Sequence, residues 1–153
     1  KEKTLRYPGH IEKMRVLRES GFFSQDEIEV NGVKIKPLDF TSKLLFPMWE
    51  LKEGDEEFTV MKIIVEGEKD KEKIRYTYNL LDRHDKKTNI HSMARTTGYT
   101  ATTMVRLLAK DMFDQKGICP PEYIGQRPEC VDFVLNELKE KGVIYNKVIE
   151  TLK

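Results

Sequence analysis

Three side chains that can bind or protonate a small anion lie close together near the start of the sequence. Arg6, Tyr7 and His10 surround a Pro-Gly dipeptide in the run LRYPGH. Because proline and glycine interrupt regular structure, the run predicts a short strand, Thr4 to Tyr7, followed by a helix from about His10 to Ser20. The first N–H groups of a helix attract anions. This corner therefore suits the carboxylate of a small molecule.

A second group of similar chemistry is Arg95 with Thr96 and Thr97, in the run SMARTTGY. Apolar residues recur at helical spacing only after Thr96, which predicts that a helix begins there. The threonine hydroxyls either cap this helix or donate hydrogen bonds to a carboxylate, and both interpretations stay open. In the same way, Arg6 can pair with a surface glutamate and His10 can be an ordinary residue at a helix start.

Turn residues and proline place the next elements. Apolar residues alternate on both sides of Asn31-Gly32, which predicts a two-residue hairpin. Pro37 begins a helix that should end or kink near Pro47. The segments EFTVMKIIVEG and KIRYTYNLL predict two strands that pair antiparallel, with a buried face on the second that consists of Ile74, Tyr76, Tyr78 and Leu80.

The last third of the sequence predicts two more helices. The first should bury the stripe Thr97, Ala101, Met104, Val105, Leu108 and Met112. The second runs from about Pro128 to Gly142, with the short strand VIYN after it. The sum is an α+β fold, a mainly antiparallel mixed sheet with about four helices packed on one face, and residues 1–153 form one domain.

Composition excludes several classes of function. Lys and Arg number 27 against 26 Asp and Glu, without the basic excess typical of nucleic-acid binders. No apolar run approaches the roughly 20 residues of a membrane span. Cys119 and Cys130 lack the spacing of a zinc site or a disulfide framework, so we expect no metal and a reducing cytoplasm. His84 and His91 are interpreted as surface residues.

Four segments in order carry a resemblance to a known family. TLRYPGHIEKMRVLRESGFF, SMARTTGYTATTMVRLLAK, KGICPPEYIG and LKEKGVIY resemble the C-terminal, substrate-binding and dimerisation domain of the saccharopine dehydrogenase family. The prokaryotic lysine 6-dehydrogenase-like branch is the most similar in appearance. The resemblance covers nearly the whole chain. It implies a larger enzyme, and the absence of an initiator Met is consistent with a fragment of one.

The resemblance also implies an activity for that larger enzyme. An N-terminal Rossmann domain would bind NAD or NADP, and the enzyme would oxidise a carbon bearing an amine, as in lysine or saccharopine. Hydride would pass to nicotinamide, and water would then hydrolyse the imine. This chain carries no glycine-rich dinucleotide loop, so we expect it to bind no cofactor and to be inactive alone.

Roles for individual residues follow from this implied reaction. Arg6 and Arg95 are expected to converge on the substrate carboxylate, with hydrogen bonds from Tyr7, Thr96 and Thr97, and His10 is the candidate acid or base. These residues form our predicted substrate site.

The sequence also leads to an expectation about assembly and leaves an alternative function open. The resemblance implies a homodimer, for which the apolar segments Phe22–Phe23 and Phe46–Trp49 are candidate contacts. The alternative is a free-standing small-molecule-binding or regulatory domain without catalysis. The sequence does not choose among lysine, saccharopine and a carboxylated polyamine, nor between NAD and NADP.

Overall fold

The computed structural model describes residues 1–152, and the chain divides between Asp55 and Glu56 into two compact units. Both units combine helices with antiparallel strands, which confirms the predicted α+β class. The strands form two separate sheets, whereas a single sheet was expected, because the first hairpin pairs only with itself. That residues 1–153 form one domain stays a prediction.

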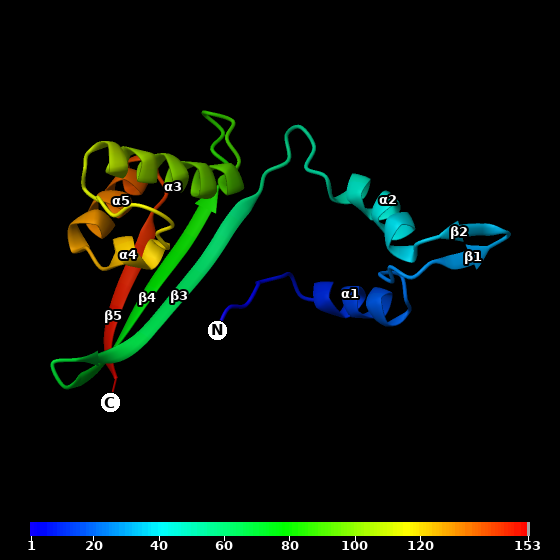
Figure 1. Ribbon diagram of the computed structural model, residues 1–153, viewed down its shortest axis with the longest axis horizontal. Coiled ribbons are helices and arrows are strands. Elements are labelled where there is room, and N and C mark those ends of the chain that lie inside the picture. The colour runs from blue at the N-terminus through cyan, green and yellow to red at the C-terminus, as the bar shows by residue number, and fades with distance from the viewer. Residues whose placement is uncertain (153) are drawn as a thin grey trace. The chain divides into compact units, whose positions relative to one another are not determined.

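The first unit contains two helices and a hairpin. They are α1 (His10–Glu19), β1 (Ile28–Val30), β2 (Val33–Ile35) and α2 (Pro37–Trp49) (Figure 1). The predicted helix start at His10 is confirmed. The hairpin at Asn31-Gly32 is confirmed too, since both residues have positive φ, 51° and 79°, as a two-residue turn of this kind requires.

The first unit differs from two predictions. Thr4 to Tyr7 has no regular structure, because a strand needs a neighbour and no described strand pairs with this segment. Helix α2 continues through Pro47 to Trp49. A proline so near the last turn removes only one hydrogen bond, and the Glu50 N–H still donates to the Phe46 carbonyl at 2.9 Å.

The second unit is built on a three-stranded antiparallel sheet. Its strands are β3 (Phe58–Lys69), β4 (Glu72–Arg83) and β5 (Tyr145–Leu152), in the order β3-β4-β5. The predicted pairing of the two long strands is confirmed, from Phe58 opposite Arg83 to Lys69 opposite Glu72. The final strand is longer than the VIYN segment that was predicted, because it pairs with β4 as far as Leu152 opposite Lys73.

Three helices pack together over one part of this sheet. They are α3 (Ser92–Ala109), the short α4 (Pro121–Gly125), which was not predicted, and α5 (Pro128–Glu140) (Figure 1). Figure 1 shows the hairpin end of β3 and β4 extending beyond them. The buried apolar core consists of Leu80, Leu107, Phe113, Cys130, Val134, Leu138 and Val143.

The predicted start of α3 is wrong, and its predicted buried face is right only in part, since Met104 and Met112 pack against the core. The helix begins at Ser92, one turn earlier than expected. Its buried residues are Ser92, Arg95, Thr103 and Leu107, whereas Val105 and Leu108, expected inside, are 65% and 50% exposed. Polar residues occupy part of the inward face of α3. The stripe that was predicted from hydrophobic residues alone is therefore rotated about the helix axis relative to the face that is buried.

The predicted faces of β4 are confirmed in part. Leu80 is buried as expected. Thr77, on the face opposite the four residues expected to be buried, is only 7% exposed, because it lies in the central strand between its partners Ile64 and Val148. Among residues 1–152, every helix is too short or too polar to cross a membrane.

Candidate functional site

The corner before α1 is a tight turn. The Tyr7 carbonyl accepts a hydrogen bond from the His10 N–H at 3.1 Å, with Pro8 and Gly9 between them. Gly9 has φ 83° and ψ −12°, the left-handed conformation that a type II turn requires at its third residue. The Pro-Gly pair therefore reverses the chain and starts α1 at His10.

This turn presents all three predicted residues of the first group. The Tyr7 side chain is 73% exposed, Arg6 is exposed, and His10 is partly buried as the first residue of α1. Arg6 donates one hydrogen bond, from Nη1 to the neighbouring Leu5 carbonyl at 3.0 Å. Gly9 has no side chain to cap the first N–H groups of α1. The corner therefore combines a guanidinium, a phenol, an imidazole and a helix N-terminus, all of which suit a carboxylate.

Arg95 lies in a different setting, inside the second unit. Its guanidinium donates from Nε to both carboxylate oxygens of Asp82, at 3.3 and 3.2 Å, and from Nη2 to Oδ1 at 3.2 Å. Nη1 donates to Asp85 Oδ2 at 3.3 Å, and Nη2 donates to the Lys141 carbonyl at 3.0 Å. The side chains of Arg95 and Asp82 are only 8% and 3% exposed. This arrangement links α3, the end of β4 and the end of α5.

The electrostatics of this cluster favour the charged form of Arg95. The hydrogen bonds to Asp82 raise the pKa of the Arg95 guanidinium further above its usual value, against the effect of burial. Hydrogen bonds from Thr88 and the Lys87 N–H, with a smaller contribution from Arg95, hold the pKa of Asp85 below its usual range. Burial raises the pKa of Tyr145, and Asp82 adds to this shift.

The network has a direct consequence for the predicted role of Arg95. A guanidinium has five N–H groups, and these contacts use four of them. Arg95 therefore joins three elements of its own unit, and its contact with a substrate stays a prediction. Arg6 and Arg95 belong to different units, so their convergence on one ligand stays a prediction as well.

Thr96 and Thr97 lie within α3 and not at its start. The Thr96 hydroxyl donates to the Ser92 carbonyl one turn earlier, at 2.9 Å. Thr97 is exposed. The expected capping role is wrong for both, because α3 begins at Ser92, and the Met93 N–H donates instead to Glu57 Oε1 at 3.3 Å. Their role in substrate binding stays a prediction.

Sequence reasoning missed the partners of Arg95, which are Asp82, Asp85 and the Lys141 carbonyl. A signal for Asp82 was available, because strand alternation places it on the same face as the buried Leu80, where a charge needs a partner. The other two partners carried no such signal. They depend on a loop and on a helix end that pack together only in three dimensions.

The interpretation of His84 and His91 as surface residues is confirmed only in part. Both are partly buried, and their ring centroids lie 4.6 Å apart. His84 Nε2 lies 3.0 Å from Asn89 Oδ1, and His91 Nδ1 lies 3.7 Å from Glu57 Oε1. His84 thus contacts its own loop, while Glu57, directly before β3, accepts the Met93 N–H at the start of α3 and lies near His91.

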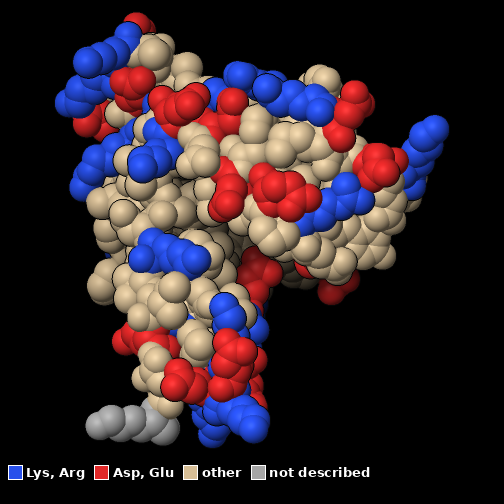
Figure 2. All heavy atoms as spheres, turned by 90° about the vertical axis from the view of Figure 1, so that its left-hand side faces the viewer, with Lys and Arg blue, Asp and Glu red and all other residues tan. Residues whose placement is uncertain are grey.

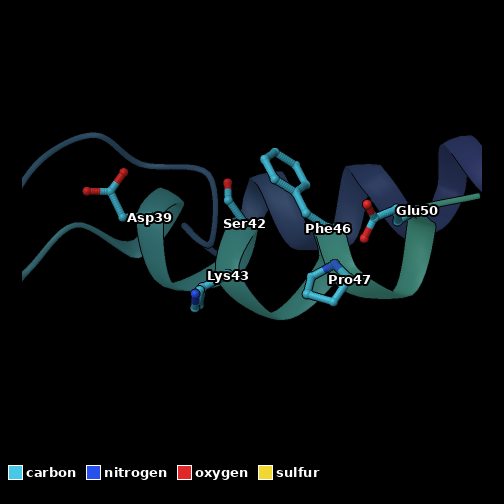
Figure 3. Close-up of a pocket in the computed structure, with 6 residues that line it drawn as sticks. All are labelled: Asp39, Ser42, Lys43, Phe46, Pro47 and Glu50. Atoms are coloured by element: carbon cyan, nitrogen blue, oxygen red, sulfur yellow. The ribbon is translucent and has the colours of Figure 1, made fainter.

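A shallow hollow also lies along α2 in the first unit. It is bounded by Asp39, Ser42, Lys43, Phe46, Pro47 and Glu50. Figure 3 shows these side chains spread along the helix with the two carboxylates at opposite ends, so they do not converge on a common point. The hollow therefore offers less specific chemistry than the Arg6 corner.

Charged side chains of both signs cover the surface. On the face shown in Figure 2, lysine and arginine are interspersed with aspartate and glutamate. Exposed ion pairs include Lys86 with Glu56, at 2.6 Å. The chain as a whole has a net charge of +1. The expectation that it binds no nucleic acid stays a prediction.

Comparison with protein families places these features in context. The fold is that of a small α+β chain, and its most polar exposed corner places Arg6 and Tyr7 just before the N-terminus of α1. A model of the family described as the saccharopine dehydrogenase C-terminal domain matches residues 1–143. The chain belongs to this family, which confirms the resemblance. The family consists of C-terminal domains of oxidoreductases of amino-acid metabolism, within the NAD(P)-dependent dehydrogenases.

The described residues do not fit a dinucleotide. Dinucleotide sites form at the carboxyl ends of parallel strands with a glycine-rich turn into a helix. All strand pairs among residues 1–152 are antiparallel. The loop that leads from β4 into α3 contains no glycine. Cofactor binding is therefore not assigned to any residue of this chain.

Proposed function

We propose that this chain is the substrate-binding and dimerisation domain of an NAD(P)-dependent oxidoreductase that acts on the CH–NH group of an amino acid of the lysine or saccharopine type. Its task is to bind the amino-acid end of the substrate, while the cofactor is bound elsewhere in the enzyme. The family match over residues 1–143 supports the class of enzyme. We place the enzyme in the cytoplasm, consistent with the two free cysteines.

The observation that carries the binding role is the Tyr7-Pro8-Gly9-His10 turn. It places an exposed Arg6 directly before the N-terminus of α1. A guanidinium holds a carboxylate through two parallel hydrogen bonds, and the helix N–H groups favour the same charge. Tyr7 supplies a further hydrogen bond. His10, the first residue of α1, is the candidate group for exchanging a proton with the substrate amine.

A direct test is titration of the chain with lysine, saccharopine and a carboxylated polyamine, followed by amide chemical shifts in the NMR spectrum. We expect shifts in the residues from Arg6 to Glu12, the corner and the first turn of α1. The Arg6→Lys variant should bind about ten- to a hundredfold more weakly, because it keeps the charge but loses a charge-assisted bond worth about 1.5–3 kcal/mol.

Arg18→Lys is the matched control, because the same change then falls in the last turn of the same helix. It should leave the shifts unaltered. Chemical-shift changes that lie outside the corner, or an equal loss of affinity in Arg6→Lys and Arg18→Lys, would contradict the proposed site.

The second candidate is a free-standing small-molecule-binding or regulatory domain that uses the same corner. The exposed turn alone would serve either role. A dinucleotide-binding segment encoded in the same gene supports the enzyme, and its absence there supports the regulatory domain.

A further inference from the structure

One edge of the three-stranded sheet is open along a long strand. β3 pairs with β4 over its whole length, and within residues 1–152 no strand pairs with its other edge. The strand has 12 residues and therefore extends for about 40 Å. An open edge of this length presents a row of N–H and C=O groups that can bind another strand.

The middle of β3 is apolar on both faces and accessible to solvent. Val60, Met61, Ile63, Ile64 and Val65 are between 40% and 55% exposed. Helices α3 to α5 cover another part of the sheet (Figure 1). An apolar edge strand in this state normally has a partner.

Protection against edge pairing is sparse in this strand. It contains no proline, and its one-to-one register with β4 shows no bulge. Lys62 is the one charge between Val60 and Val65. A lone lysine protects an edge only when no carboxylate lies opposite it.

The sequence of β3 is complementary to itself in one antiparallel register. With Ile64 opposite Ile64 of a second copy, Ile63 lies opposite Val65, and Lys62 lies opposite Glu66 on both sides of the twofold axis. Glu66 is already held in place, because it accepts a hydrogen bond from Arg75 Nε at 2.7 Å. Between Lys62 and Glu66 the register therefore pairs apolar with apolar and opposite charges with each other, and only farther out does Val60 lie opposite Glu68.

Neighbouring symmetric registers lack this complementarity. Centres at Lys62 or Glu66 place like charges directly opposite each other. A centre at Ile63 places Lys62 opposite Ile64, and a centre at Val65 places Ile64 opposite Glu66. Only the centre at Ile64 satisfies both the charges and the apolar side chains.

The other open edge of the sheet, β5, is a poorer candidate. Symmetric pairing about Val148 places Lys147 opposite Ile149, and pairing about Ile149 places Val148 opposite Glu150. No central register of β5 pairs opposite charges.

We infer that two copies of this chain pair through their β3 strands, antiparallel and centred on Ile64, to form one continuous six-stranded sheet. The second copy is the occupant that the register specifies, because the complementarity is that of the strand with itself. This interface differs from the apolar segments Phe22–Phe23 and Phe46–Trp49 that the sequence suggested for dimerisation.

Cysteine cross-linking tests the register. Directly opposite Cα atoms in an antiparallel pair lie about 4.5–5.5 Å apart, within the range of a disulfide. In a Cys119→Ser background, Ile64→Cys should form a disulfide-linked dimer under mild oxidation. Ile63→Cys is the matched control and should stay uncross-linked, because its counterpart lies two positions away along the strand.

A charge change tests the same interface without a cross-link. Lys62→Glu places a second carboxylate opposite Glu66 on both sides of the twofold axis, and should weaken the dimer about tenfold or more in analytical ultracentrifugation. Lys69→Glu makes the same change at the end of β3, and should alter the dissociation constant by less than about twofold. Circular dichroism of both variants checks that the fold is retained.

Three results would overturn the inference. They are a chain that stays monomeric at high micromolar concentration, a cross-link through Ile63→Cys in place of Ile64→Cys, and equal effects of Lys62→Glu and Lys69→Glu. If the chain dimerises but Ile64→Cys forms no cross-link and Lys62→Glu does not weaken the dimer, the interface lies on another surface, such as the apolar segments of the first unit.

Discussion

At the scale of single residues, Arg95 shows how a side chain with binding chemistry can serve the fold. Its contacts with Asp82, Asp85 and the Lys141 carbonyl use most of its hydrogen-bonding capacity. A buried charge that loses its partner is strongly destabilising, whereas an exposed pair contributes little. Arg95 and Asp82 therefore depend on each other.

We predict that Asp82→Ala lowers the free energy of unfolding by about 3–5 kcal/mol, because it leaves the Arg95 guanidinium buried without its main partner. Chemical denaturation measures this value. Asp114→Ala is the control, since it breaks a pair with Arg127 in which the carboxylate is 81% exposed, and it should change the free energy of unfolding far less than Asp82→Ala does. Similar losses for the two variants would contradict this view of Arg95.

Asp85 offers a prediction about pH. Its pKa is lowered mainly by the Thr88 hydroxyl, so Thr88→Val should raise it toward its usual value, as measured by NMR titration of the carboxyl group. A depressed carboxylate pKa stabilises the fold above the unfolded-state value of about 3.9, and this stabilisation disappears as the pH falls through the folded-state pKa.

The variant should therefore be less stable than the original chain at neutral pH, and the two should become equal in acid. Thr102→Val, which removes a hydroxyl that donates only to the Tyr99 carbonyl, should leave the pKa of Asp85 unchanged. If the pKa of Asp85 is the same in Thr88→Val as in the original chain, the Thr88 hydroxyl is not the main cause of the lowered pKa.

At the scale of elements, the end of α5 is defined by hydrogen bonds around a glycine. After α5, the Gly142 N–H donates to the Lys139 carbonyl and the Val143 N–H donates to the Leu138 carbonyl, both at 2.9 Å. This pattern is a Schellman motif, and Gly142 adopts the positive φ of 79° that it requires. The motif also directs the Lys141 carbonyl to Arg95.

Gly142→Ala should destabilise the chain by at least about 1–2 kcal/mol, the usual cost of a side chain in the left-handed region. The added Cβ would also lie 3.2 Å from Arg95 Nη2. Gly98→Ala is the control, because it lies inside α3 with nothing within 4 Å of an added Cβ, and it should stabilise by about 0.5–1 kcal/mol. Thermal unfolding of both variants measures the contrast, and a loss of stability in Gly98→Ala of the same size would contradict it.

Local signals predicted those elements whose residues specify their own backbone. Asn31-Gly32 identified the hairpin, and His10 after Pro-Gly identified the start of α1. The end of α3 carried no such signal, because Asp111 takes the left-handed position that glycine holds elsewhere, with φ 54°. The start of α3 was misplaced for a related reason: its first turn buries Ser92 and Arg95, which hydrophobic periodicity does not count.

At the scale of the whole molecule, the order of four segments predicted the family, and the match over residues 1–143 confirms it. The candidate site was predicted less completely. The Arg6 corner follows from its own turn, whereas the partners of Arg95 come from β4, a loop and the end of α5. Contacts between such distant segments depend on packing, which a single sequence does not reveal.

The architecture leads to a prediction about the cofactor. Antiparallel strands and the lack of a glycine-rich phosphate turn among the described residues provide no dinucleotide site. We therefore expect no heat of binding when the chain is titrated with NADH or NADPH in a calorimeter. Micromolar binding of either cofactor would show that the site had been placed in the wrong part of the enzyme.

The central claim is that the Arg6 corner holds the carboxylate of an amino-acid substrate, and steady-state kinetics of the intact enzyme with Arg6→Lys test it most directly. The account predicts a higher KM for the amino acid with a nearly unchanged KM for the cofactor, and a loss of about ten- to a hundredfold in kcat/KM. Arg18→Lys should match the unmodified enzyme. Unchanged kinetics in Arg6→Lys, or an equal rise in KM for the cofactor, would contradict the claim.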